Sequence, residues 1–238
     1  MALVNLLAGI SLFMATKRII FFGDSLAFPK KKYGVNLFDT YPFKTSIKLN
    51  SQHFIASQPA ATSLDVINQL HRAIDEFDYS DSFDVAVIQV GIVDCCPRSH
   101  SFLLERFLRK FSFLRPFINQ LYKSKKPKKP WIDEDRFGRN IIDICKLSSL
   151  VAKKVILIPI MPGVNNLIKN IYNINDYVNA YNNILNEQII SSSLSNCSII
   201  AMDTRENFEE LLLPDGHHLT TKGHEVLSLN IVNEIQNE

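Results

Sequence analysis

A serine directly follows the first apolar run of this 238-residue sequence. The run at Arg18–Phe22 leads into Gly23-Asp24-Ser25-Leu26. In a parallel sheet, ligands bind at the carboxyl ends of the strands, and a glycine there permits a sharp turn. The Ser25 hydroxyl can therefore be presented to a cleft. The alternative is an ordinary strand-to-helix turn in which Ser25 caps the helix.

A carboxylate and a histidine lie close together near the other end of the sequence, in Pro214–Thr220. A serine hydroxyl becomes a good nucleophile when a base takes its proton, and histidine suits this task because its pKa lies near neutrality. A carboxylate fixes the tautomer of the imidazole and stabilises the imidazolium. Asp215 and His218 have the Asp-x-x-His spacing that places both groups in one turn. The alternative is an Asp-Gly turn followed by a helix cap at Thr220 or Thr221.

Buried strands and amphipathic helices are expected to position these groups. Continuous apolar runs are typical of strands that are buried on both faces of a parallel sheet. Stretches with helical spacing alternate with them, and the first opens with a capping-box pattern at Thr62 and Asp65. This alternation predicts a three-layer α/β domain. The predicted strands are Arg18–Phe22, His53–Ala56, Val85–Val90, Val155–Ile160 and Ser198–Met202, and the predicted helices are Leu64–Phe77, Arg136–Ala152, Asp176–Ile190 and Thr221–Ile235.

Taken together, the Gly-Asp-Ser-Leu and Asp-x-x-His segments resemble the GDSL, or SGNH, hydrolase family. In that family the first segment follows the first strand, and the second lies near the C-terminus. The resemblance covers the chain from about Lys17 to its end. It implies a flavodoxin-like α/β/α sandwich around a five-stranded parallel sheet. It also implies that Ser25 is the nucleophile, His218 the general base and Asp215 its orienting partner, with His217 less suited to be the base.

The family's oxyanion hole has three hydrogen-bond donors, and the sequence departs from two of them. The amide of Ser25 is the first donor. The second is a glycine amide, and the matching segment Gln58–Ser63 has Ala60 at that position. This change is mild because the donor is a main-chain N–H.

The third donor is an asparagine side chain in a Gly-x-Asn-Asp pattern, which reads Gly91-Ile92-Val93-Asp94 here. Val93 cannot donate a hydrogen bond. Three interpretations follow: Arg98 supplies the missing donor, the segment is shifted so that Asp94 faces the site in a substrate-binding role, or activity is reduced or lost. An ionised Asp94 would oppose an oxyanion.

Charge is unevenly distributed along the sequence. The net charge is only +2, which does not favour a nucleic-acid partner, and no nucleic-acid-binding module is present. Residues 98–130, however, hold ten Lys or Arg residues against one acid, Glu105. We read this segment as a basic, Phe-rich insertion at about 98–130. Residues 99–130 are interpreted as a contact surface for an anionic glycan or for a membrane, or as an amphipathic hairpin packed on the domain.

The N-terminal segment differs in composition from the rest of the sequence, which divides the chain into two parts. Residues 1–16 carry no charge and are mostly apolar, but they are short for a membrane span and lack a basic signal region. They are interpreted as a packed helix, a weak anchor or a leader. Residues 17–238 are predicted to form a single domain. The predicted location is the cytoplasm, either free or in peripheral association with a membrane. No cofactor or metal is predicted, because a Ser-His-Asp triad needs none and the cysteines form no CxxC pair.

These features favour a serine esterase that acts through an acyl-enzyme. Members of the family often act on acetyl groups of carbohydrates, so the resemblance implies a small-molecule or glycan substrate with an O-acetyl ester. An O-acetyltransferase would use the same triad, and Val93 leaves a catalytically weak glycan-binding protein as another alternative.

Overall fold

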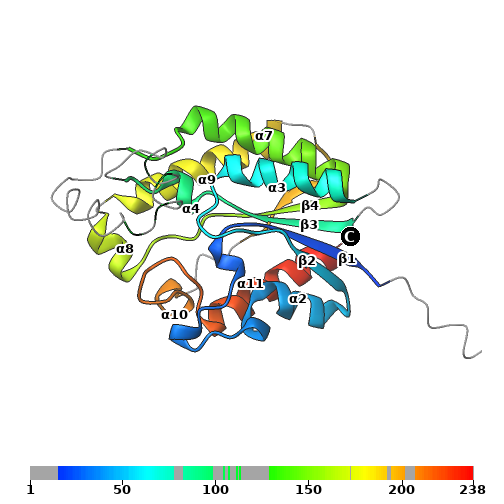
Figure 1. Cartoon of the computed structure of the whole chain (residues 1–238), viewed down its shortest axis with the longest axis horizontal. Coiled ribbons are helices and arrows are strands. Elements are labelled where there is room, and N and C mark those ends of the chain that lie inside the picture. Colours follow the sequence, from blue (N-terminus) through cyan, green and yellow to red (C-terminus); the bar gives the residue numbers. More distant parts are fainter. Residues whose placement is uncertain are drawn as a thin grey trace, which may run out of the picture.

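A single parallel sheet forms the centre of the structure, a computed structural model (Figure 1). The structure describes residues 16–77, 83–98, 129–171, 173–191, 194–201 and 207–237, with positions 104, 107, 111 and 113. All strand pairs are parallel, and the strand order β2-β1-β3-β4-β5 is that of a flavodoxin-like fold. The strands are β1 Arg18–Gly23, β2 Gln52–Ile55, β3 Phe83–Gln89, β4 Ala152–Ile158 and β5 Cys197–Ile199.

Helices cover both faces of this sheet, which confirms the predicted α/β/α sandwich (Figure 1). Helices α3, α7 and α9 pack together on one face, and α2 and α11 pack together on the other. Short helices surround the end of the sheet at which the strands finish. The helices are α2 Tyr41–Leu49, α3 Ser63–Glu76, α4 Ile92–Cys95, α7 Glu134–Val151, α8 Asn165–Asn170, α9 Ile174–Ser191, α10 Phe208–Leu211 and α11 Thr221–Gln236, with 3₁₀ turns η1 Ser25–Ala27, η2 Lys31–Tyr33 and η3 Leu37–Asp39.

The apolar runs of the sequence form the hydrophobic core, as expected for strands that are covered on both faces. Residues 19–22 of β1 and 85–88 of β3 are at most 3% exposed, because helices cover both sides of these strands. Removing such surfaces from water is the main driving force for this fold. The predicted capping box is confirmed: the Thr62 hydroxyl accepts a hydrogen bond from the Asp65 N–H, and the Asp65 carboxylate accepts one from the Thr62 N–H.

The basic insertion leaves and rejoins the domain at one place, since the Arg98 N–H donates to the Lys129 carbonyl at 3.1 Å. Most of its residues, like residues 1–15, lie outside the described part of the chain. Its contact with an anionic glycan or membrane therefore stays a prediction, as do the interpretations of residues 1–16. Within the described ranges, no helix combines the length and the apolarity that crossing a bilayer requires.

Candidate active site

Ser25, His218 and Asp215 form a continuous hydrogen-bonded chain at the carboxyl end of β1. The Ser25 Oγ lies 2.9 Å from the His218 Nε2, and the His218 Nδ1 lies 2.8 Å from the Asp215 Oδ2. With its proton on Nδ1, the imidazole donates to the carboxylate and accepts from the serine hydroxyl. The structure therefore joins a hydroxyl, a base and a carboxylate in the order needed to activate a nucleophile.

Ser25 is held at this position by a turn that requires glycine before it. Gly23 has a φ of +145°, and a Cβ at this position would lie 2.2 Å from the main-chain oxygen of Gln89 on β3. The Gln69 side chain of α3 accepts from the Gly23 N–H and donates to its carbonyl, at 3.1 and 3.0 Å. Asp24 then caps η1 by accepting from the Leu26 N–H at 2.9 Å. These contacts fix the direction in which the chain leaves β1, and they thereby fix the position of Ser25.

His218 is held by a second tight turn, just before α11. Gly216 has a φ of +89°, and a Cβ there would lie 2.0 Å from the Val164 carbonyl oxygen. The Asp215 Oδ1 accepts from the main-chain N–H groups of His217 and His218 at 3.2 and 3.0 Å. The Thr220 hydroxyl caps α11 by accepting from Gly223 N–H. The Asp-Gly turn and the helix cap thus coexist with the triad geometry.

The carboxylate of Asp215 is stabilised in its ionised form. Burial alone would raise its pKa, but the hydrogen bonds from the His218 ring and from the main chain outweigh burial and hold the pKa well below its usual value. Asp215 therefore remains an acceptor for the His218 Nδ1–H across the neutral range, which keeps the His218 Nε2 available to Ser25.

His217 is part of the same turn but does not contact Ser25. Its ring packs on that of His218 with 4.1 Å between centroids, and its Nδ1 is buried without a hydrogen-bond partner among the described residues. Burial, followed by the nearby His218, lowers the pKa of His217 to about 4, so the ring is neutral at pH 7. Sequence reasoning considered His217 only as the less suited base and missed its position beside the triad.

A small cavity lies between the segments that carry Ser25 and His218, and it is lined by their neighbours Leu26 and His217. Its volume is about 10 Å³, and it lies between Leu26 of η1, Gln89 at the end of β3, and His217. Ile160 and Met161, which follow β4, contribute to its apolar wall. A space of this size admits about one water-sized group.

Ala60, which the family resemblance matches to the second oxyanion donor, follows a segment that runs beside β1. Residues 56–58 run beside the end of β1, with Ala56 N–H donating to the Phe21 carbonyl and Gln58 N–H to the Gly23 carbonyl. Ala60, two residues further on, has a φ of +54°. This left-handed conformation favours glycine, which accounts for the glycine of the family pattern at this place.

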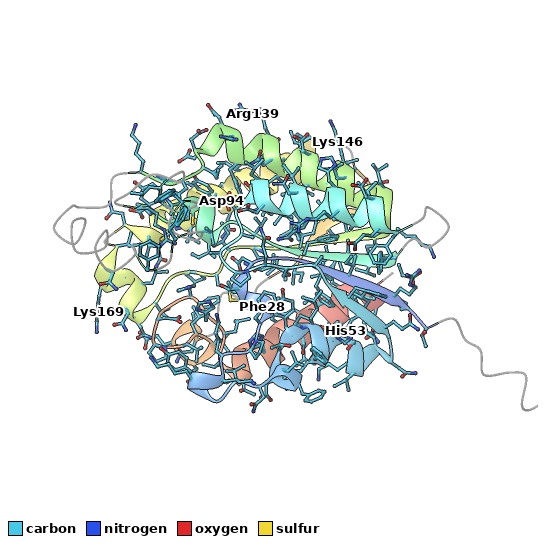
Figure 2. All side chains as sticks on the ribbon, in the orientation of Figure 1. Phe28, His53, Asp94, Arg139, Lys146 and Lys169 are labelled. Carbon is cyan, nitrogen blue, oxygen red and sulfur yellow. The ribbon has the colours of Figure 1, made fainter. Side chains whose placement is uncertain are left out.

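Asp94, for which a shifted segment would give a substrate-binding role, is buried in the structure. Its side chain is 0% exposed, and its carboxylate accepts from the Ser63 N–H at 2.9 Å and from the Ser63 hydroxyl at 2.6 Å. Burial raises the pKa of this carboxyl to about 6. Figure 2 shows Asp94 inside the molecule, whereas Arg139 and Lys146 project outward from α7. Asp94 therefore links α4 to the first residue of α3, and the segment is not shifted toward the site.

Val93 stands where the family pattern has its third oxyanion donor, and Arg98 is the residue expected to replace that donor. Val93 is 6% exposed within α4 and provides no polar group. The Arg98 guanidinium lies over the Trp131 ring, 5.0 Å from its centroid, and its Nε is buried without a partner among the described residues. Its positive charge helps to lower the pKa of the nearby His217, after the larger effects of burial and of His218.

Asp24, next to the nucleophile, gives a pH-dependent prediction. It is fully buried, and burial raises the pKa of its carboxyl to about 7, with a smaller effect from Asp94. The unfolded chain has a carboxyl pKa of about 4, so between these values the folded state keeps a proton that the unfolded state has lost. The carboxyl therefore destabilises the fold increasingly as the pH rises through this window.

We expect Asp24→Asn to raise the melting temperature at about pH 8 and to change it much less at about pH 4, because the amide never ionises. The Asn oxygen can still accept from the Leu26 N–H. Thermal unfolding across this pH range measures the effect, with the exposed Asp75→Asn on α3 as the matched control. An equal change at both pH values would contradict the burial argument.

The comparisons with known proteins concern the fold. No family model matches the sequence, and no curated protein matches it. Solved structures do match: a lipase/acylhydrolase from Enterococcus faecalis has 16% identity and a TM-score of 0.65 over 93% of this chain and 96% of its own. A lipolytic protein of the G-D-S-L family from Veillonella parvula has 12% identity and a TM-score of 0.61, covering 94% and 100%.

The acetylxylan esterase Axe2 from Geobacillus stearothermophilus has 14% identity and a TM-score of 0.58, covering 93% of this chain and 95% of its own. At this level of identity the likeness establishes the architecture: the chain has the α/β/α fold of the GDSL, or SGNH, hydrolases.

Proposed function

We propose that the protein is a carboxylic ester hydrolase in which Ser25 is the nucleophile, His218 the general base and Asp215 its orienting partner. The observation that carries this proposal is the pair of short contacts, 2.9 Å from Ser25 to His218 and 2.8 Å from His218 to Asp215. They join groups from two ends of the chain, each held by a glycine-dependent turn.

In the proposed reaction, the Ser25 oxygen attacks the carbonyl carbon of the ester while its proton passes to the His218 Nε2. The tetrahedral intermediate collapses to an acyl-enzyme, and His218 returns the proton to the departing alcohol. Water then attacks the acyl-enzyme with His218 again as base, releasing the carboxylic acid and restoring Ser25. Asp215 stays ionised throughout and stabilises the imidazolium.

The proposed oxyanion hole consists of the main-chain N–H groups of Ser25 and Ala60 and the guanidinium of Arg98. The two backbone segments converge at the end of β1, which supports the first two donors. The half-buried Arg98 has a donor without a partner among the described residues, which supports the third. A guanidinium would offer a charge-assisted hydrogen bond where the asparagine of the family pattern offers a neutral one.

We propose an acetyl ester on a carbohydrate as the substrate. The small cavity lined by Leu26 and His217, the chain neighbours of Ser25 and His218, would suit a short acyl chain better than a long one. Acetylxylan esterases among the structures with this fold make a sugar ester a reasonable choice. An O-acetyltransferase would use the same acyl-enzyme and differ only in its acceptor.

Val93 supports a second candidate, a glycan-binding protein with little catalysis on the same scaffold. A fold alone does not ensure activity, and the removal of one oxyanion donor typically costs about 10²–10³ in kcat.

A fluorophosphonate probe, which reacts with activated serines, separates the two candidates. We expect the folded protein to be labelled at Ser25 and to hydrolyse aryl acetates faster than aryl octanoates. Labelling should be lost in His218→Ala and kept in His71→Ala, a control at an exposed histidine of α3. A folded protein that is neither labelled nor active would favour the binding role.

A further inference from the structure

We propose that Asp215, His217 and His218 form an inhibitory site for Zn²⁺, in which the ion binds on the far side of His218 from Ser25. Each of the three side chains offers one ligand atom, and these atoms all lie within 4.8 Å of one another. The inhibition of ester hydrolysis by Zn²⁺ rests on the proposed function, whereas the binding of Zn²⁺ does not.

The spacing of the ligand atoms suits a tetrahedral ion. Zinc binds imidazole nitrogen and carboxylate oxygen at about 2.0–2.2 Å, so neighbouring ligand atoms around one ion lie about 3.3–3.6 Å apart. The His217 Nδ1 is 3.6 Å from the Asp215 Oδ1. The His218 Nδ1 is 2.8 Å from the other carboxylate oxygen, the Asp215 Oδ2, so the carboxylate or the ring would have to turn for a single oxygen to bind the ion with both nitrogens.

His217 provides the independent observation that points to a ligand. Its Nδ1 is buried, faces the carboxylate of Asp215 and has no hydrogen-bond partner among the described residues. A buried polar atom without a partner is costly, and a bound ion would satisfy it.

The surrounding charges select the kind of ion. Lys30 and Arg98 carry positive charges near Asp215 and His217, respectively. Their positive charges oppose any dication, so Mg²⁺ and Ca²⁺, which prefer oxygen ligands, would gain little here. Zn²⁺ gains from the two imidazoles, which are ligands that it favours.

Binding would switch the tautomer of His218. Zinc would bind the lone pair that the His218 Nδ1 gains when it loses its proton. That proton would move to Nε2. The imidazole would therefore stay neutral, and no net proton would be released. A protonated Nε2 cannot accept the Ser25 proton, and the carboxylate that oriented the base now binds the ion. The nucleophile would lose its base without any change in the fold.

The test measures zinc binding and activity separately on the full chain. Titration calorimetry of the metal-free protein with Zn²⁺ should show one site, with no comparable binding of Mg²⁺. His217→Leu should weaken binding by at least about 10–100-fold, the loss that removal of even an outer-shell partner causes. His71→Leu should bind like the parent, and His217→Gln, which keeps a polar side chain, checks the result if the leucine variant unfolds.

Zn²⁺ should also inhibit aryl acetate hydrolysis, EDTA should reverse the inhibition, and the inhibitory concentration should rise in the His217 variants in step with the binding constant. Equal zinc affinity in the parent and in both His217 variants would overturn the site. Binding that depends on His217 but leaves hydrolysis unchanged would overturn the inhibition. A protein that binds zinc through His217 but hydrolyses no ester would refute the proposed function and retain the site.

Discussion

Replacement of Asp215 by Asn is expected to lower kcat/KM for aryl acetates by about 10⁴-fold, the loss that a wrong histidine tautomer causes in serine hydrolases. The Asn side chain would present an N–H to the His218 Nδ1, which lies 2.8 Å from the Asp215 Oδ2. The His218 proton would then move to Nε2, and the base could no longer accept from Ser25. The Asn oxygen would still accept from the main chain, so the turn itself should persist.

Steady-state hydrolysis and thermal unfolding of the same preparations test this prediction. The exposed Asp75→Asn on α3 makes the same chemical change away from the site and should leave kcat/KM at the parent value. If Asp215→Asn retained full activity with an unchanged melting temperature, Asp215 would have no role in orienting the base.

Replacement of Arg98 by Ala is expected to reduce kcat by about 10²–10³, the typical loss for one oxyanion donor. Val93 offers no donor, and the Nε of Arg98 is buried without a partner among the described residues. Because the donor acts mainly on the charge that develops in the transition state, kcat should fall far more than KM rises. Arg98→Lys should recover part of the rate, since an ammonium donates but lacks the planar fork.

The matched control for Arg98 is Arg139→Ala, which removes the same group from the outer face of α7 (Figure 2). An unchanged kcat in Arg98→Ala would indicate that the main-chain donors suffice. A rise in KM with kcat unchanged would instead place Arg98 in substrate binding.

Sequence patterns predicted the central strands well because most residues of β1, β3 and β4 are buried, whereas the edge strands β2 and β5 are only partly buried. The strand predicted at Val85–Val90 lies at Phe83–Gln89, and the helix predicted from Leu64 begins at Ser63. Boundaries were less certain where charged residues enter a strand. β4 begins at Ala152 rather than Val155, because both lysine ammonium groups find partners: the Lys153 Nζ lies 2.8 Å from Asp84, and the Lys154 Nζ donates to the Glu234 carbonyl. Helix α2 was not predicted, since it begins with Tyr41-Pro42 and has no long apolar repeat.

The contacts of His218 with Ser25 and Asp215 could be predicted because the three residues lie within two short segments. The groups that support these residues could not, because their contacts join distant parts of the chain. The Gln69 side chain accepts a hydrogen bond from the Gly23 N–H, 46 positions away in the chain. The Asp94 carboxylate accepts one from the Ser63 N–H, 31 positions away. The short helix α4 has no pattern that tells which of its residues faces the cleft. Only the fold reveals that Asp94 turns inward.

The contact between Ser25 and His218 spans 193 positions of the chain. On the ribosome, the nucleophile therefore emerges long before its base. A nascent chain carries an inert hydroxyl until the turn that contains Asp215 and His218 has been synthesised and α11 has docked beside α2. Under the proposed function, ester hydrolysis would therefore report that the segments around Ser25 and His218 have come together.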